Sequence, residues 1–433
     1  MNLRLAKLMV TVSVVLAAPA SAQNGEEAYR SAARWTVQVR TSVSEPFIQD
    51  EQGTWFGAGL LVDSRRGWIL TNAHVAGRSY GKVNVAFEDG KAIPARRVYV
   101  DPYLDLAVLA YDTQRVAPKA ATPTLDCDSM PPVGHPVGAF GHPWGFRFTG
   151  TRGIISAVTT RMGPNMLQTD APINEGNSGG PLISLETGEV VGVNTAKIKE
   201  EAVEGLSFAV PMPYACTVLK LLEAGGDPSP PAHLVDFARD DNDEQTLVIA
   251  RSRLPAGTLD LRVGDEILAV TSPERAVANS TDLVDALRGR LDRVSLRVRR
   301  DGRDVEVGGR LPAAAKVTER RGLAVSGALV AEAEPLTLGL IADNPALMVH
   351  YVAPGSEAES AGLAAFDLIM SADGAPVSSL DGFAQRARAA AATGRPVELM
   401  LLRIGSETQE EFFIYQRRLL PVEELQAVGP TAR

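Results

Sequence analysis

Short apolar runs broken by turn residues dominate the first half of the chain. Between Trp35 and Pro213, runs such as 37–40, 59–62, 68–70, 83–87, 107–109 and 190–193 are rich in β-branched residues. Gly, Pro, Asp or Asn separates them, as expected for strands joined by tight turns. About a dozen such strands predict a β-barrel or a pair of barrels. Residues 23–34, which are polar and rich in alanine, are expected only as a lead-in.

The second half of the chain contains a weak repeat of about 100 residues, which indicates two similar small units. Residues 214–224 have a helical pattern, and the Pro/Gly-rich run 225–231 that follows is typical of a linker. In each copy an apolar run, a helical stretch (281–290 or 380–391) and two strands joined at a glycine (Gly302 or Gly405) follow one another. We expect two small α+β domains over 232–312 and 313–420, and a flexible polar tail over 421–433.

Composition supports a folded, acidic protein of several domains. The chain has 433 residues, of which 45% are hydrophobic and 22% charged, and its net charge is -9. This length suggests about three domains. The negative charge argues against non-specific binding of nucleic acid, so no nucleic-acid partner is expected.

Residues 1–22 have the pattern of a signal peptide. Arg4 and Lys7 precede an apolar run over 8–18, and Ala20, Ser21 and Ala22 form an A-x-A cleavage site. The run is shorter than the ~20 residues that span a bilayer, which favours cleavage after Ala22 over retention as a membrane anchor. The mature protein would then be exported to the periplasm.

Two cysteines, Cys127 and Cys216, are the only ones in the chain. An oxidising compartment would permit a disulfide between them. From the sequence alone, a disulfide between them and two buried free thiols are equally compatible with the pattern.

Three motifs carry residues of serine-protease chemistry. Ser178 lies in the run Gly-Asn-Ser-Gly-Gly-Pro-Leu, His74 in Thr-Asn-Ala-His-Val, and Asp105 in Asp-Leu-Ala-Val-Leu. A serine needs a base to act as a nucleophile, and a histidine base needs a carboxylate to fix its tautomer. The order His, Asp, Ser is that of the chymotrypsin-type proteases.

These three motifs resemble the active-site blocks of the HtrA/Deg family of exported serine proteases. The resemblance implies a mainly β fold: a chymotrypsin-like double β-barrel protease domain over 23–224, followed by two PDZ-like α+β domains. It implies a catalytic triad of His74, Asp105 and Ser178. It also implies an oxyanion hole built from the backbone of Gly176, Asn177 and Ser178, with Asn177 shaping the turn.

Other candidate residues are set aside on their context. Asp101 precedes a proline and is typical of a turn, whereas Asp105 directly precedes an apolar strand. The remaining histidines are not expected to be functional, because they lie in Pro/Gly-rich segments typical of loops (His135, His142) or stand isolated in the sequence (His233, His350). No group of His, Cys or carboxylates has the spacing of a zinc or calcium site, and no cofactor motif is present, so no metal or cofactor is expected.

The second repeat opens on residues that resemble the carboxylate-binding loop of a PDZ domain. Gly322, Leu323, Ala324 and Val325 would offer backbone N–H groups to a peptide C-terminus, while a neighbouring strand pairs with the peptide. An ordinary first strand is the alternative. The first repeat lacks this Gly-Leu element and is predicted to be a degenerate copy that does not bind peptides.

The resemblance implies a periplasmic endopeptidase that cleaves unfolded or damaged polypeptides, binds peptide C-termini at its second PDZ domain and assembles as a homotrimer. The alternative is a peptide-binding chaperone or stress sensor whose protease mostly rests. The stretch 196–205 is rich in Lys and Glu, unlike the Gly/Ser-rich loop usual in the family.

Overall fold

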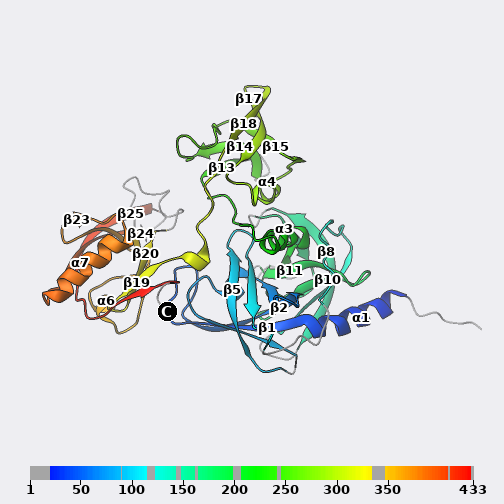
Figure 1. Ribbon diagram of the computed structural model, residues 1–433, viewed down its shortest axis with the longest axis horizontal. Coiled ribbons are helices and arrows are strands. Elements are labelled where there is room, and N and C mark those ends of the chain that lie inside the picture. Colours follow the sequence, from blue (N-terminus) through cyan, green and yellow to red (C-terminus); the bar gives the residue numbers. More distant parts are fainter. Residues whose placement is uncertain are drawn as a thin grey trace, which may run out of the picture.

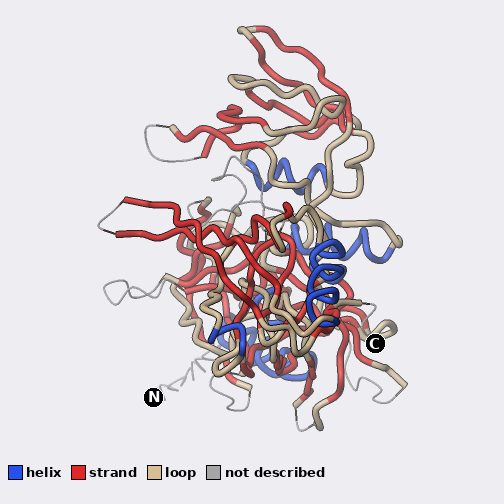
Figure 2. The backbone as a smooth tube through the Cα atoms, turned by 90° about the vertical axis from the view of Figure 1, so that its left-hand side faces the viewer, coloured by secondary structure: helices blue, strands red, loops and turns tan. Residues whose placement is uncertain are grey.

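The structure is a computed structural model that describes residues 20–88, 90–114, 122–142, 148–160, 164–197, 206–240, 245–333, 347–407 and 410–430. Two closed barrels form its centre, and two further sheets follow in the second half of the chain (Figure 1). The view of Figure 2 shows how strands dominate every part of the molecule. The predicted fold class, mainly β with a double barrel and two α+β units, is confirmed.

The first barrel closes in the strand order β1-β2-β3-β6-β5-β4. Its apolar side chains point inward; Leu60, Ile69 and Leu109, for example, are fully buried. The one-turn helix α2 (Ala73–Ala76) follows β3 directly. The strands are β1 (Thr36–Val43), β2 (Gly53–Asp63), β3 (Trp68–Thr71), β4 (Lys82–Phe87), β5 (Ile93–Asp101) and β6 (Leu106–Tyr111).

The second barrel closes in the order β10-β11-β12-β9-β8-β7 and is followed by helix α3 (Met212–Glu223). Cys127 and Cys216 form a disulfide with their Cα atoms 5.6 Å apart, which decides the question that the sequence left open. This bond ties the segment before β7 to helix α3. The strands are β7 (Pro136–Gly141), β8 (Thr149–Thr159), β9 (Met166–Thr169), β10 (Pro181–Ser184), β11 (Val190–Lys197) and β12 (Ser207–Pro211).

Residues expected only as a lead-in belong to a helix, α1 (Ala20–Trp35). Ala28, Ala32 and Trp35 are buried in the same core cluster as the first barrel. Their spacing of three and four residues puts them on one helical face, so burial of this face stabilises the helix. The segment is thus a packed helix and not only a lead-in; its buried face is marked mainly by alanine, which is a weak apolar signal.

The first repeat forms a sheet in the order β13-β14-β15-β17-β18, with β16 on β15. Its bounds are β13 (Val235–Arg239), β14 (Gln245–Ser252), β15 (Glu266–Thr271), β16 (Glu274–Ala276), α4 (Ser280–Leu287), β17 (Val294–Arg300) and β18 (Arg303–Gly309). Asp301 and Gly302, both at positive φ, form the predicted turn between β17 and β18.

The second repeat forms a sheet in the order β25-β24-β22-β21-β20-β19-β26, with β23 on β22. A short 3-10 helix, η2 (Val317–Glu319), leads into it. The other bounds are β19 (Gly322–Val325), β20 (Ala328–Glu332), β21 (Leu347–Val352), α6 (Glu357–Ser360), β22 (Leu368–Ala372), β23 (Ala375–Pro376), α7 (Leu380–Ala392), β24 (Val397–Glu407), β25 (Glu410–Leu420) and β26 (Leu425–Val428).

Two expectations for the second repeat are wrong. Gly405 does not turn the last hairpin; it pairs with Phe412 inside the ladder, and the strands continue to Glu407 and Glu410. The segment from Pro421 is not simply a loose tail, because β26 adds to the sheet beside β19. Its polar composition concealed a strand that keeps two of its four residues exposed.

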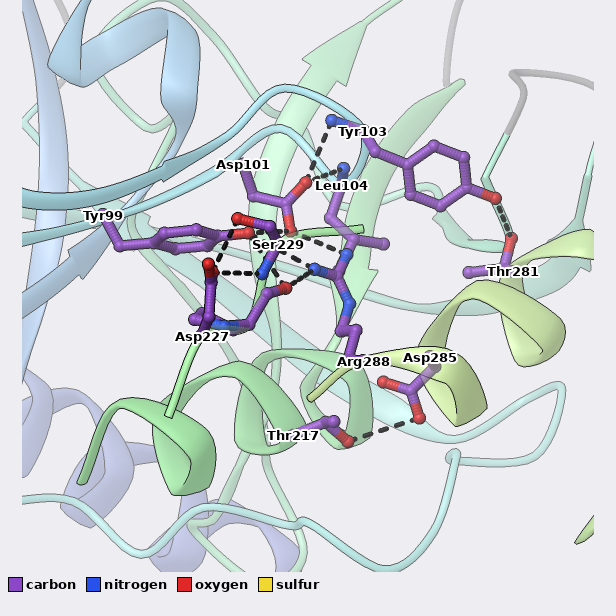
Figure 3. A network of polar contacts seen from close by, with 11 residues as sticks. Tyr99, Asp101, Tyr103, Leu104, Thr217, Asp227, Ser229, Thr281, Asp285 and Arg288 are labelled. Atoms are coloured by element: carbon purple, nitrogen blue, oxygen red, sulfur yellow. Dashed lines mark hydrogen bonds and ion pairs between the residues drawn. The ribbon is translucent and has the colours of Figure 1, made fainter. Parts of the chain in front are cut away.

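The first repeat is joined to the first barrel by a buried ion pair (Figure 3). Arg288, at the end of α4, places Nη2 2.7 Å from Oδ2 of Asp101, and both side chains are fully buried. Nη1 of Arg288 donates to the carbonyl oxygen of Pro228 in the linker. The hydroxyl of Tyr99 lies 3.1 Å from that oxygen and from Asp101 Oδ2. The repeat, the linker and the barrel therefore share one polar network.

The other oxygen of Asp101 shapes the turn that follows β5. Oδ1 accepts hydrogen bonds from the backbone N–H groups of Tyr103, at 3.0 Å, and Leu104, at 3.1 Å. Asp105 is the next residue. Asp101 is thus a turn residue, as predicted, and its charge is balanced from the first repeat.

Replacing Arg288 with methionine should destabilise the protein by about 3–5 kcal/mol, because the substitution leaves the Asp101 carboxylate buried without a cation. Urea unfolding measures the loss. The double variant Arg288→Met/Asp101→Asn should recover much of it. Arg299→Met, which breaks an exposed pair with Glu266, is the matched control and should cost under about 1 kcal/mol. An equal loss in both single variants would contradict the assignment.

Candidate active site

His74 lies on the short helix α2, which the chain enters straight from β3. The indole Nε1 of Trp55 lies 3.1 Å from the carbonyl oxygen of His74 and 3.0 Å from that of Val75, so it anchors the helix to β2. The imidazole remains 45% exposed. The ring is therefore held from its backbone side and open to a substrate.

Asp105 is held against His74 by its backbone and its carboxylate. Its φ is 53°, a conformation unusual outside glycine. The amide of Asn72 donates to the carbonyl oxygen of Asp105 at 2.9 Å, as does the N–H of Ala73 at 3.1 Å. Oδ1 accepts the backbone N–H of His74 at 3.0 Å, and Oδ2 lies 2.7 Å from His74 Nδ1. Donors from residues 72–74 therefore fix both the backbone and the carboxylate of Asp105.

Thr195 on β11 contacts Asp105 from the second barrel. Its hydroxyl donates to Asp105 Oδ2 at 2.6 Å. Burial opposes the charged form of Asp105, but hydrogen bonds from His74 and Thr195 outweigh burial and hold the pKa of Asp105 below its ordinary value. An ionised carboxylate only accepts hydrogen bonds, so Nδ1 of His74 carries the proton and Nε2 is left as an acceptor.

Ser178 lies in the turn between β9 and β10 of the second barrel, where this turn meets β2 of the first barrel. The N–H of Ala58 on β2 donates to the carbonyl oxygen of Ser178 at 2.8 Å. Gly179 has φ +83°, and a Cβ there would lie 2.2 Å from the carbonyl oxygen of Ala58. A Cβ on Gly180 would lie 2.1 Å from the carbonyl oxygen of Phe140. Close approach of the backbone therefore requires both glycines.

The backbone before Ser178 leaves donors free. Gly176 adopts φ 99°, which favours glycine. The N–H of Asn177 is used inside the turn, donating to Asn174 at 2.9 Å. Within the part of the chain that the structure describes, neither Gly176 nor Ser178 donates its N–H to a protein acceptor. Two N–H groups two residues apart are what an oxyanion hole needs. Asn177, expected among the backbone residues of the hole, serves the turn instead.

The hydroxyl of Ser178 donates to the carbonyl oxygen of Thr195 at 2.8 Å. Across the described residues, no hydrogen bond joins Ser178 to His74. Such contacts often form only when substrate is bound.

Two supporting residues, Thr195 and Asn72, have roles that the sequence did not reveal. The partner of both is Asp105, which lies 90 residues from Thr195 and 33 residues from Asn72 in the sequence. A pocket of about 250 Å³ lies beside this cluster and is lined by Asp105 and Thr195 together with Pro102, Tyr103, Pro164, Met166 and Phe208. Both barrels contribute to its walls.

The other histidines lie elsewhere. His135 shares a hydrogen bond of 2.8 Å with the hydroxyl of Ser184, and His233 lies 3.2 Å from Asp236. His350 is buried and accepts the N–H of Ile48 at its Nδ1, 3.2 Å away. His142 is buried as well. Of the sequence stretch 196–205, residues 198–205 lie outside the described part of the chain.

Gly322, Leu323, Ala324 and Val325 together form the whole of β19. One edge of β19 pairs with β20, as expected for the start of a sheet. The other edge, where a peptide was predicted to add, pairs with β26 of the same chain. The described part of the first repeat has no strand equivalent to β19, so β13 stands at the end of its sheet.

The double-barrel fold agrees with comparisons to known proteins. A family model described as a trypsin-like peptidase domain matches residues 57–193. A solved structure titled "HtrA-type protease AlgW with tripeptide" aligns with a TM-score of 0.54 at 27% identity, over 69% of this chain and 98% of that one. The class of protein is therefore a serine peptidase with a trypsin-like fold.

Curated relatives narrow the class. The chain is 35% identical over 285 residues to the serine protease Do-like HtrA of Lactococcus lactis, covering 57% of this chain and 68% of the relative. It is 31% identical over 347 residues to the probable periplasmic serine endoprotease DegP-like of Chlamydia pneumoniae, covering 75% and 69%. The chain belongs to the HtrA family of serine proteases, and it is a serine endopeptidase.

The lowered pKa of Asp105 predicts how its charge stabilises the fold. A carboxylate whose folded pKa is lowered contributes stability above the ordinary pKa of about 3.9 and loses it as the pH falls through the folded value. The difference in unfolding free energy between the parent and Asp105→Asn should therefore shrink as the pH falls below about 4. Urea unfolding at a series of pH values measures it, and a difference that stays constant or grows as the pH falls from about 4 to about 2 would contradict the prediction.

Proposed function

We propose that this endopeptidase cleaves unfolded or damaged polypeptides with a triad of Ser178, His74 and Asp105. The observation that carries the proposal is the 2.7 Å contact of His74 Nδ1 with Asp105 Oδ2, beside a serine in a glycine-rich turn where two barrels meet. A nucleophile, a base and a carboxylate that orients the base are the parts that acyl transfer requires.

In this mechanism the Ser178 hydroxyl turns from the Thr195 carbonyl toward His74. Nε2 of His74 takes the proton as Oγ attacks the scissile carbonyl, and the ionised Asp105 stabilises the imidazolium. The free N–H groups of Gly176 and Ser178 stabilise the oxyanion of the tetrahedral intermediate. His74 then gives its proton to the leaving amine, which leaves an acyl-enzyme. Water, deprotonated by His74, hydrolyses this ester and restores Ser178.

The same proposal includes location, regulation and assembly. The signal-peptide pattern before Gln23 and the relatives named periplasmic support export to the periplasm. Among the described residues, no helix is long and apolar enough to cross a membrane. The second repeat would bind peptide C-termini at β19 and regulate the protease. Resemblance to the family supports a homotrimer.

A second candidate function is a peptide-binding chaperone or stress sensor whose protease rests. The hydrogen bond from Ser178 to the carbonyl of Thr195 favours it, because a serine held there is not engaged by its base. A serine-directed fluorophosphonate distinguishes the two candidates. Stoichiometric labelling of the isolated protein supports a competent protease, and labelling only after peptide is added supports a resting one.

Replacing Ser178 with alanine should abolish cleavage of unfolded casein while the protein stays folded. Loss of the nucleophile in a triad typically lowers kcat by about 10⁴ to 10⁶. Casein cleavage and fluorophosphonate labelling measure the loss, and near-ultraviolet circular dichroism checks the fold. The control is Ser378→Ala, an exposed serine of the second repeat, which should retain parental activity. Cleavage by Ser178→Ala at a tenth of the parental rate would require another nucleophile.

The protein recovered from the cell envelope should begin at Gln23. The A-x-A site at Ala20–Ala22 directs signal peptidase to this bond. Helix α1 of the full-length chain runs from Ala20 to Trp35, so the cut would remove only its first residues and keep its buried face. N-terminal sequencing tests the site. An intact Met1 would show an uncleaved segment and contradict export by cleavage.

A further inference from the structure

We propose that residues 425–428, strand β26, act as an internal ligand that occupies the peptide-binding edge of the second repeat. The inference rests on the proposed binding of peptide C-termini at β19. It goes further by naming what fills this edge in the resting protein and by predicting that an incoming peptide has to displace it.

Strand β26 takes the last free edge of β19. The antiparallel register pairs Val325 with Leu425 at one end and Gly322 with Val428 at the other. The opposite edge of β19 is paired with β20 over its full length. A peptide that binds by strand addition needs an unpaired edge. The two ligands therefore exclude each other.

The polarity of β26 matches that of a terminal peptide. The carboxylate of such a peptide would lie at the loop before β19, so its last residues would pair with the start of this strand. Val428, near the C-terminal end of β26, pairs with Gly322, the first residue of β19. The chain then continues through Gly429, which lies beside the backbone of Arg320 and Arg321. Where a bound peptide would end in a free carboxylate, the chain of this protein continues through the backbone of Gly429.

Helix α7 packs beside β19 and β26. Leu425 packs against the core cluster that includes Leu323 of β19 and Phe383 of α7. Nη2 of Arg321, just before β19, lies 2.6 Å from Oδ1 of Asp381 in the first turn of α7, so an ion pair joins the start of β19 to this helix. An incoming peptide would have to use the strand edge and helix wall that β26 now uses.

Strand β26 is anchored at both ends but only half-buried between them. At its start, the N–H of Ser326 donates to the carbonyl oxygen of Glu424 at 3.0 Å, and the N–H of Glu423 donates to Oγ of Ser326 at 3.0 Å. At its end, Val428 packs beside Phe47 of the first barrel. Gln426 and Ala427 are exposed. A strand this short can leave the edge without unfolding the sheet.

Tethering makes even a weak internal ligand effective. Four residues separate β25 from β26, and a short linker raises the effective concentration of its segment to about the millimolar range. If β26 leaves the edge free in about a tenth of the molecules, the apparent Kd of a peptide rises about tenfold. Peptides that match the groove should carry an aliphatic residue where Leu425 lies.

The test compares peptide binding with β26 present and disrupted. The parent is the full chain carrying Ser178→Ala, so that the probe is not cleaved. Successive N–H groups of a strand point to opposite edges, so one of the two residues 426 and 427 donates toward β19. The double substitution Gln426→Pro/Ala427→Pro therefore removes a donor that faces β19, whichever of the two it is. The probe is a fluorescein-labelled peptide, Val-Glu-Glu-Leu-Gln-Ala-Val, with a free carboxylate, and fluorescence anisotropy reports its Kd.

The double variant should bind this probe at least tenfold more tightly than the parent. Amidation of the probe should weaken its binding to the variant at least tenfold, because a charged acceptor is lost. Gln426→Thr, at an exposed position that can still pair, is the matched control and should bind like the parent. A chain ending at Glu424 repeats the test if the proline variant loses its near-ultraviolet spectrum.

Hydrogen exchange of the β19 amides distinguishes failure of the internal-ligand inference from failure of the peptide-binding proposal. Exchange should be at least tenfold faster in the double variant than in the parent. Equal probe affinity in parent and variant, or unchanged exchange, overturns the internal ligand and leaves peptide binding standing. No binding by any variant, with faster exchange, overturns the peptide-binding proposal and the inference with it, and identifies β26 as a structural edge strand only.

Discussion

The carboxylate of Asp105 is the point on which the arrangement of the two barrels depends. A carboxylate that is largely withdrawn from water, as this one is with 21% of its side chain exposed, is costly unless hydrogen bonds and opposite charges surround it. His74 supplies two of these contacts from the first barrel, and Thr195 supplies another from the second. The second barrel can provide the Thr195 hydroxyl only when it closes against the first. The same closure brings Ser178 to the backbone of Ala58. Satisfying one carboxylate and assembling the candidate site are therefore the same event.

Both repeats rest on the first barrel, which carries His74 and Asp105. The first repeat reaches it through Arg288 and Asp101. The second reaches it near Phe47, where the guanidinium of Arg320 lies 4.7 Å from the ring centroid, and through the hydroxyl of Tyr80, which donates to the carbonyl oxygen of Arg320 at 2.6 Å. Tyr80 lies six residues after His74 in the sequence. The contacts made by both repeats therefore lie on segments of the first barrel close in sequence to His74 and Asp105.

Much of this organisation could be predicted from the sequence, and the remainder depends on contacts between distant segments. Local motifs predicted His74, Asp105 and Ser178 as candidate residues, and local periodicity predicted the barrels and α7. The role of Thr195 could not be found in this way, because nothing near it in the sequence refers to Asp105. Strand β26 was missed for a related reason: its polar sequence becomes a strand only because β19 offers it an edge. Helix α1 was missed because alanine contributes little to a hydrophobic pattern, yet Ala28 and Ala32 are buried.

The disulfide makes the covalent closure of the second barrel depend on the redox state of its surroundings. Cys127 and Cys216 are 89 residues apart, and most of the second barrel, with the Ser178 turn, lies between them. Closing a loop of this length removes many conformations from the unfolded chain. Oxidising compartments let such a bond form and persist, whereas reducing compartments keep the two thiols free. A chain held in a reducing compartment therefore lacks the covalent closure of the segment that carries Ser178.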